Sequence, residues 1–263
     1  MKIDERSLYL FMATYAPWNE SPAYPQRFFR CLEESGFRPE RYDDRDPPRR
    51  RFTGNEQDVQ FWFAKRQGAG RWLHFQRQAH PHPYGMTVHW VDRNIEFYRT
   101  RGDFHELCMW PAAEDAKAVV ALWESLCRNL HPFHAFLDTD RNYNRRAHEI
   151  APDGRITNKN TGWYLHYLPG LFAYNYFGTV YLRRWGASVQ NLSAALTAPD
   201  VNGLFVAAPS GLDLEGRMSE VYSPGDLAII QTLGTEWFHL PDQTDRKHGP
   251  SLDEFAATTP QPV

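Results

Sequence analysis

The chain has few cysteines, no long apolar run and no basic leader at its N-terminus. Its 263 residues include three cysteines, Cys31, Cys108 and Cys127, which form no CxxC pair. A disulfide scaffold and a zinc knuckle are therefore not expected, and the thiols are expected to be buried and inert. Apolar runs are far shorter than the about 18 residues of a membrane span. Acids Asp4 and Glu5 stand where a signal peptide needs cations. These absences favour a soluble, cytoplasmic protein without a membrane partner.

The sequence also lacks the common motifs of catalytic and nucleotide-binding sites. It contains no GxSxG, no HExxH and no P-loop. Gly68 and Gly70 form a GxG without a third glycine, and a predicted strand follows instead of a helix. Ser210 stands in Pro-Ser-Gly, which is typical of a turn. No catalytic residue, cofactor-binding residue, metal ligand or cofactor is predicted from these patterns.

Charge of one sign is not in excess. Lys plus Arg number 29 and Asp plus Glu number 32, so the net charge is −3 and a direct nucleic-acid partner is not expected. An arginine cluster that would suit phosphate comprises Arg45, Arg49, Arg50 and Arg51. The neighbouring aspartates that largely cancel it are Asp43, Asp44 and Asp46. Because the segment 38–51 is charged and holds three prolines, it is predicted to be a solvated loop.

Aromatic residues are the main compositional excess, at 15% of the chain, beside 42% hydrophobic and 23% charged residues. This composition predicts a real core and disfavours disorder. Trp18, Tyr143 and Trp163 stand beside loop residues and are expected to be exposed. Exposed aromatic side chains with charged neighbours favour contacts between proteins.

The hydrophobic periodicity predicts an α+β fold, with mixed or antiparallel sheets and packed helices. Strands are predicted over 7–15, 71–78, 84–92, 106–110, 134–137, 171–177, 204–208 and 235–240. Helical patterns cover 22–35, 57–66, 112–129, 141–151, 179–185, 191–196 and 225–233. The clearest is 112–129, whose apolar residues form one continuous stripe.

The domain prediction is a single α+β domain over 1–245, followed by a flexible tail over 246–263. Each half of the domain holds a strand, a helix and a run of strands, which suggests two similar halves, 1–105 and 106–245. No break in composition marks a linker between them.

Two sets of polar residues are candidates for metal ligands. His80 and His82 stand two apart, with His74 and His89 nearby, but prolines alternate with the first pair, and solvated loop histidines are the simpler interpretation. The second set is Asp138 and Asp140, with Arg141 and Glu149 close in sequence. Carboxylates after a strand suit Mg²⁺. The simpler interpretation is a polar turn in which both aspartates bond to local backbone.

The most distinctive segment is Pro-Gly-Leu-Phe-Ala-Tyr-Asn-Tyr-Phe-Gly at 169–178, followed by Tyr181 and Gly186. It resembles an element of bacterial toxin-immunity proteins, namely the immunity protein 52 family and related type VI secretion immunity families. The resemblance implies a protein that is not an enzyme and that binds and neutralises a cognate toxin in bacterial competition. It supplies no toxin-contacting residues, because each such protein matches its own toxin.

The residues of this segment also have a structural interpretation. Pro169-Gly170 turns the chain into a strand, and Gly178 frees the backbone for the next turn. Asn175 lies among apolar residues, so its amide is expected to bond to the backbone of an adjacent loop.

Three hypotheses of function remain at this point. The first is the immunity-type binding protein. The second is a metal-dependent hydrolase or nuclease that uses Asp138, Asp140 and a histidine. The third is an accessory protein of a secretion or phage system.

Overall fold

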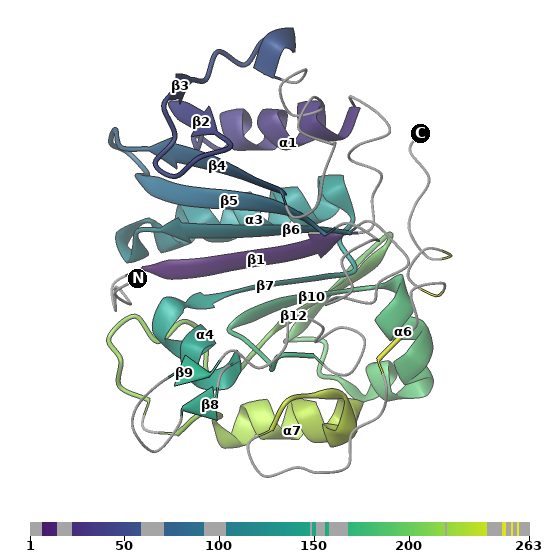
Figure 1. Ribbon diagram of the computed structural model, residues 1–263. Helices are drawn as coiled ribbons and strands as arrows, with labels where there is room; N and C mark the ends of the chain where they lie inside the picture. Colours follow the sequence, from purple (N-terminus) through teal and green to yellow (C-terminus); the bar gives the residue numbers. More distant parts are fainter. Residues whose placement is uncertain are drawn as a thin grey trace.

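An antiparallel sheet of ten strands organises the molecule, as Figure 1 shows. The computed structural model describes residues 7–14, 23–58, 71–91, 104–147, 149–150, 156–157, 168–218, 220–240, 249–250, 254 and 257. The strand order across the sheet is β11-β12-β10-β7-β1-β6-β5-β4-β2-β3. The predicted α+β class is therefore confirmed, in its antiparallel form.

The bounds of the elements follow in chain order. The strands of the large sheet are β1 (Leu8–Thr14), β2 (Arg41–Asp43), β3 (Arg50–Arg51), β4 (Arg71–Arg77), β5 (Tyr84–Val91), β6 (Phe104–Pro111), β7 (His134–Thr139), β10 (Tyr174–Gly178), β11 (Thr197–Asp200) and β12 (Gly203–Ala207). A separate pair is β8 (Glu149–Ile150) and β9 (Ile156–Thr157). The α-helices are α1 (Ala23–Glu34), α3 (Ala116–Leu130), α4 (Asp140–Ala147), α6 (Thr179–Trp185) and α7 (Pro224–Leu233), with 3-10 helices at Ala113–Asp115, Gly186–Asn191 and Thr235–Trp237.

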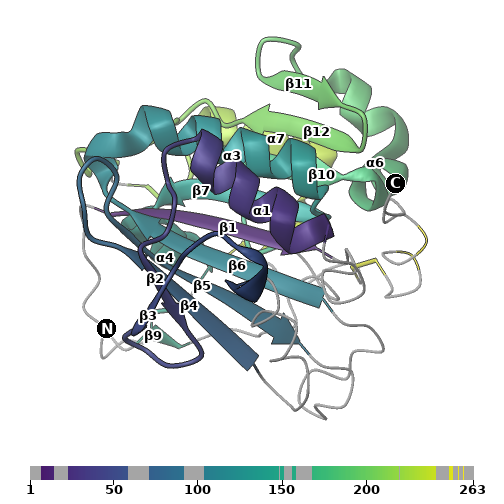
Figure 2. The same ribbon diagram turned by 90° about the horizontal axis from the view of Figure 1, so that it is seen from above.

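Helices pack on both faces of the sheet. Every residue of β1 is buried, because alternate side chains enter one of two cores. Leu8, Leu10 and Met12 join the core under α1 and α3, which lie together on one face (Figure 2). Tyr9 and Phe11 join the second core, to which α6 and α7 contribute. The centre of the sheet is therefore fully buried.

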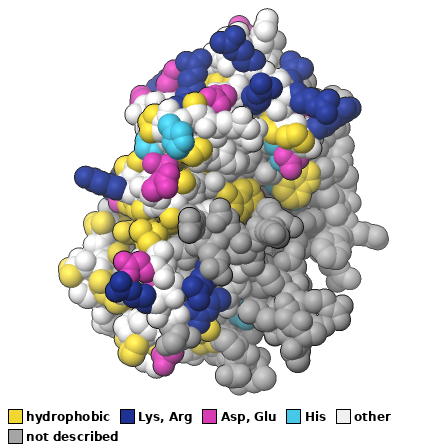
Figure 3. All heavy atoms as spheres, turned by 90° about the vertical axis from the view of Figure 1, so that its left-hand side faces the viewer, with side chains coloured by type: hydrophobic (Ala, Val, Ile, Leu, Met, Phe, Trp, Pro, Cys, Tyr) yellow, Lys and Arg dark blue, Asp and Glu magenta, His cyan; other side chains and the backbone are white. Residues whose placement is uncertain are grey.

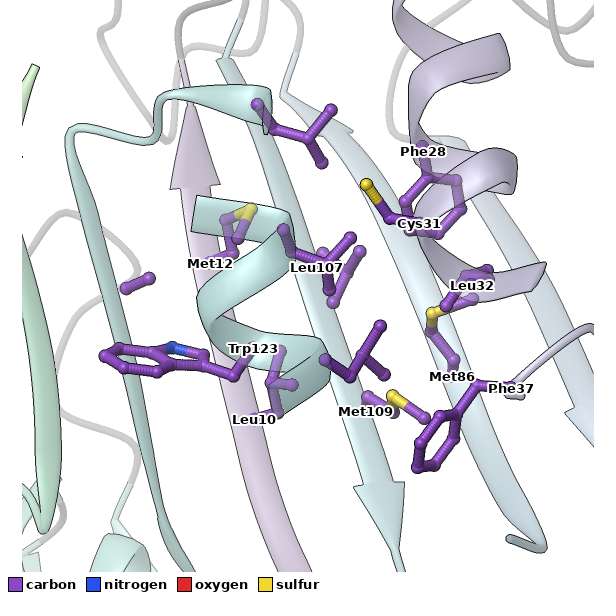
Figure 4. Close-up of a cluster of buried hydrophobic side chains, with 14 of the residues drawn as sticks. Leu10, Met12, Phe28, Cys31, Leu32, Phe37, Met86, Leu107, Met109 and Trp123 are labelled. Carbon is purple, nitrogen blue, oxygen red and sulfur yellow. The ribbon is translucent and has the colours of Figure 1, made fainter. Parts of the chain in front are cut away.

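The predicted stripe of the long helix is confirmed in α3. Its stripe residues Val119, Leu122, Trp123, Leu126 and Leu130 are all buried. Figure 4 shows Trp123 of α3 near Leu10 of β1, with Leu107 and Met109 of β6 between it and the α1 residues Phe28 and Leu32. At about 25 cal/mol per Å² of buried apolar surface, this layer is a main source of stability.

Three sequence predictions differ from the structure. The segment 38–51 is not all loop, because β2 and β3 form there; buried Tyr42 packs against Phe75 and leaves the charged neighbours exposed at the sheet edge. No strand forms over 235–240: residues 235–237 form a 3-10 turn, and Phe238 makes one isolated parallel bridge with Leu168. Residues 192–196 are not helical.

Other predictions are confirmed or fall outside the description. Ser223 caps α7 with a reciprocal capping box that involves Asp226. Most of the predicted helix 57–66 and of the tail 246–263 lies outside the described residues. None of the described helices combines the length and the apolar character needed to cross a membrane.

The two parts of the chain lie on opposite sides of β1. Strands β2 to β6 extend the sheet on one side, and β7, β10, β12 and β11 extend it on the other. The expected division between residues 105 and 106 lies inside β6, and β1 pairs with both β6 and β7. Hydrogen bonds thus join the two parts into a continuous sheet.

Candidate functional site

The face of β4, β5 and β6 that points away from α1 and α3 carries polar and aromatic residues. On the other face, alternate residues such as Leu73, Val88 and Leu107 enter the core. Because side chains of a strand alternate, their neighbours share the opposite face. This set, called the β4–β6 face below, comprises Trp72, His74, Gln76, Gly85, Thr87, His89, Glu106, Cys108 and Trp110.

Trp72 is the most exposed aromatic residue of this face, with 47% of its surface accessible. Its ring stacks on the His89 ring at a centroid distance of 3.9 Å and an interplanar angle of 6°. His89 is itself buried, and its Nδ1 lies 3.6 Å from the Oε2 of Glu106. The stack holds a large exposed ring in one orientation, so little conformational entropy is lost when a partner covers it.

The remaining groups of the face are engaged within the sheet. His74 Nδ1 lies 3.1 Å from the hydroxyl of Thr87, and the hydroxyl of Tyr9 donates to the Cys108 sulfur at 3.1 Å. Burial, with the nearby Glu106 carboxylate, raises the pKa of Cys108 to about 12. The thiol stays protonated at neutral pH, so it is a poor nucleophile.

The predicted inert cysteines are confirmed. Cys31 and Cys127 are buried, Cys108 is partly buried, and all three are free thiols. Burial raises the pKa of each.

Tyr143 was expected to be exposed, but its side chain is partly buried. Its ring stacks on Tyr9 at 4.0 Å and is partly buried against the second core. Trp18 and Trp163 lie outside the described residues. The sequence pattern placed Trp72 in a strand but did not predict its exposure. The structure shows that this tryptophan is exposed. Its position beside alternating core residues Leu73 and Phe75 is the sequence signal that places it on the outer face.

The histidines of the first candidate metal set do not lie around a common point. His80 is exposed, whereas His82 stacks on Phe37 at 4.6 Å and its Nδ1 lies 2.7 Å from Asp115 Oδ1. His74 and His89 lie on the β4–β6 face instead. Among the residues that the structure describes, no group of three or more His, Cys, Asp or Glu side chains is placed to hold a metal ion.

In the second set, the Asp138 carboxylate is already saturated. Its Oδ1 accepts from the backbone N–H of Thr139 and from the Asn142 amide, at 2.7 and 3.0 Å. Its Oδ2 accepts from the Arg146 guanidinium and from the backbone N–H of Ala173, both at 3.0 Å. Burial raises the pKa of Asp138, and these donors oppose that rise. No lone pair directed at a metal is left in this arrangement.

Arg146 is the centre of a buried polar network that sequence reasoning missed. Its guanidinium also donates to the carbonyl oxygens of Leu171 and Val221, at 2.7 and 3.0 Å, and lies 3.5 Å from Asp226 Oδ2. The network connects α4, β7, the segment before β10 and α7. An arginine in a polar sequence gives no signal of burial, so only the fold reveals the buried position of Arg146. The role supported by these contacts is structural.

The segment 169–178 lies in the same region and is also part of the core. Asn175 confirms its prediction, because its Oδ1 accepts from Phe172 N at 2.9 Å and its Nδ2 donates to Phe172 O at 2.7 Å. The strand begins at Tyr174, later than predicted. Gly178 has φ −71°, so conformational freedom is not why glycine stands there. A Cβ would lie 2.8 Å from Pro132 O, so space is the reason.

No match to this chain is found among protein-family models, curated proteins or solved structures. The resemblance of the segment 169–178 to immunity proteins therefore stays a prediction.

His134 makes the stability of the second core dependent on pH. Burial lowers the pKa of His134 to about 3, whereas an unfolded histidine has a pKa of about 6.5. Below pH 6.5 the unfolded chain takes up a proton that the folded chain does not, so stability is lost as the pH falls from 6.5 towards 3. By pH 5 this single group is expected to cost about 2 kcal/mol relative to pH 7.5.

Denaturant unfolding of wild type and His134→Gln at several pH values tests this prediction. The variant is expected to lose less stability between pH 7.5 and 5. His80→Gln, at an exposed site, is the control and is expected to keep the wild-type slope. Equal slopes for wild type and His134→Gln would contradict the assignment.

Proposed function

We propose that this chain is an immunity-type protein that binds and neutralises a cognate bacterial toxin through the β4–β6 face. The observation that carries the proposal is the half-exposed Trp72 ring held on buried His89. Buried aromatic anchors dominate the energy of protein interfaces, and partly polar surroundings are typical of their rims. The resemblance of the segment 169–178 to immunity proteins gives the class of partner, including its delivery by type VI secretion.

The groups that could carry chemistry are unsuited to it. The Cys108 thiol of the face is protonated, and the Asp138 carboxylate, which lies outside the face on β7, is saturated by internal donors. Trp110 adds a second, partly exposed indole to the face. The proposed action, in the cytoplasm, is to cover the active site of the toxin or to hold the toxin in an inactive state.

Co-expression with the product of an adjacent toxin gene tests the function. The toxin is expected to kill cells without this protein and to spare them with it, and the two chains should co-purify. If no neighbouring toxin forms a stable complex, the proposal fails. A stable partner without toxicity would favour the accessory-protein hypothesis instead.

Trp72→Ala tests the face itself. Loss of an anchoring tryptophan is expected to cost at least about 2 kcal/mol of binding, or a roughly 30-fold rise in Kd. Because the ring is half exposed, the variant should remain folded, which thermal unfolding can check. Val201→Ala, 94% exposed in the turn between β11 and β12 at the far edge of the sheet, is the control. Unchanged affinity in Trp72→Ala would place the interface elsewhere.

A further inference from the structure

An arginine-rich surface lies at the edge of the sheet formed by β2 and β3. Figure 3 shows Lys and Arg side chains gathered at the top of the molecule. Six exposed arginines come from the segment 38–51, against four acidic residues, so this segment carries a net charge of +2 in a chain of net charge −3. The six, called the arginine edge below, are Arg38, Arg41, Arg45, Arg49, Arg50 and Arg51.

One of the three aspartates expected to neutralise the cluster is used internally. The Asp43 carboxylate accepts from the backbone N–H groups of Asp44 and Arg49, at 2.9 and 3.2 Å. The side chains of Arg45, Arg49 and Arg51 have no hydrogen bond or ion pair with any residue that the structure describes. Three guanidinium groups are thus available to an external anion.

The strand register connects the arginine edge with the β4–β6 face. Gln76 of that face pairs with Arg41, and Arg41 pairs with Arg51. Paired residues of neighbouring strands point to the same side of a sheet. The row through Gln76 therefore continues into Arg41 and Arg51, and Trp72 shares this face of β4 with Gln76. One surface combines aromatic anchors with a basic border.

We propose that the arginine edge docks an acidic segment of the protein partner whose other contact is the Trp72 anchor on the same side of the sheet. This inference rests on the proposed function and names the charge of the partner surface. Guanidinium groups form forked hydrogen bonds with carboxylates, which suits Asp and Glu side chains. A positive edge on a negative protein would also orient the approaching partner and raise its association rate.

A nucleic acid is less suited to this segment. Tyr42 of the segment and Phe52 directly after it are buried and offer no ring for base stacking.

Titration of the full chain with a 20-residue poly-L-glutamate and with the oligonucleotide (dT)20 tests the proposal. Poly-L-glutamate is expected to bind at 50 mM NaCl and to weaken about tenfold at 200 mM, because salt screens exposed charges. The triple variant Arg45→Gln, Arg49→Gln, Arg51→Gln is expected to weaken binding at least tenfold. The control is Arg128→Gln, Arg183→Gln, Arg217→Gln, which removes the same charge elsewhere and should bind like wild type.

Three outcomes would overturn the inference. One is no binding of poly-L-glutamate, another is equal loss in both triple variants, and the third is tenfold tighter binding of (dT)20. A failure of the proposed function is separately visible. In that case poly-L-glutamate binds at the arginine edge, but no toxin co-purifies and Trp72→Ala has no effect.

Discussion

Arg146→Met is expected to destabilise the folded chain by about 3–5 kcal/mol, because it leaves Asp138 buried without its cation. The arginine side chain is 1% exposed, and both Asp138 and Asp226 beside it are fully buried. The methionine keeps the length of the side chain but supplies no donor. The carbonyl oxygens of Leu171 and Val221 also lose their partner. Each unsatisfied buried group adds a desolvation cost of about 1–3 kcal/mol.

Urea unfolding of wild type and Arg146→Met measures this loss. The matched control is Arg217→Met, because Arg217 forms an exposed ion pair with Glu215, and surface pairs contribute about 0–1 kcal/mol. Adding Asp138→Asn to Arg146→Met removes the orphaned charge and should restore part of the stability. A loss below 1 kcal/mol in Arg146→Met, equal to that of the control, would show that the network is not a source of stability.

The sequence predicted elements best where a single local pattern decides the structure. The stripe of α3 and the alternation in β4 and β5 are continuous apolar patterns, and both elements form where predicted. The capping box of α7 is equally local, because Ser223 and Asp226 stand three residues apart. The predictions failed where tertiary contacts decide. Charged 41–43 becomes a strand because Tyr42 is buried against its neighbours, and 235–240 stays irregular although its residues favour strands.

The candidate site was only partly predictable for the same reason. Alternation places Trp72 and His89 on one side of their strands, but which strands pair, and in which register, follows from the fold. The stack between them therefore had no sequence signal. Asp138 was noticed as a carboxylate at a strand end, yet its partner Arg146 is eight residues on and Asp226 is on α7. In the sequence alone, a carboxylate of such an ion pair resembles a metal ligand, because the arginine that binds it is not adjacent to it.

The charge at the β2–β3 edge of the sheet was also only partly predictable from the sequence. In sequence, Asp43 stands beside the arginines and appears as their counter-ion. In the fold its carboxylate closes a turn by binding two backbone N–H groups. Arg41 and Arg51 therefore share the side of the sheet that carries the half-exposed Trp72. The proposed interaction surface is thus a product of register, which joins residues that are about thirty positions apart.

Gly178→Ala is expected to destabilise the chain by about 1–3 kcal/mol or more, because the added methyl group has no space. The Cβ would lie 2.8 Å from Pro132 O and 2.9 Å from the Cα of Phe133, and both contacts are backbone atoms. Gly178 N also donates to Phe133 O at 2.8 Å, so the two segments cannot separate without loss of that bond. Relief therefore requires β10 to move away from the start of β7, at the centre of the sheet.

Gly85→Ala is the matched control, because the same substitution in β5 meets nothing within 4 Å of the new Cβ. Its free energy of unfolding is expected to stay within about 0.5 kcal/mol of wild type or to rise slightly, since alanine reduces the entropy of the unfolded chain. Chemical denaturation of both variants gives the comparison. If Gly178→Ala is as stable as Gly85→Ala, the close approach of β10 and the 132–133 backbone is not the reason for glycine. If Gly178→Ala alone is destabilised, the glycine is explained by packing, independently of any toxin-binding role of the segment 169–178.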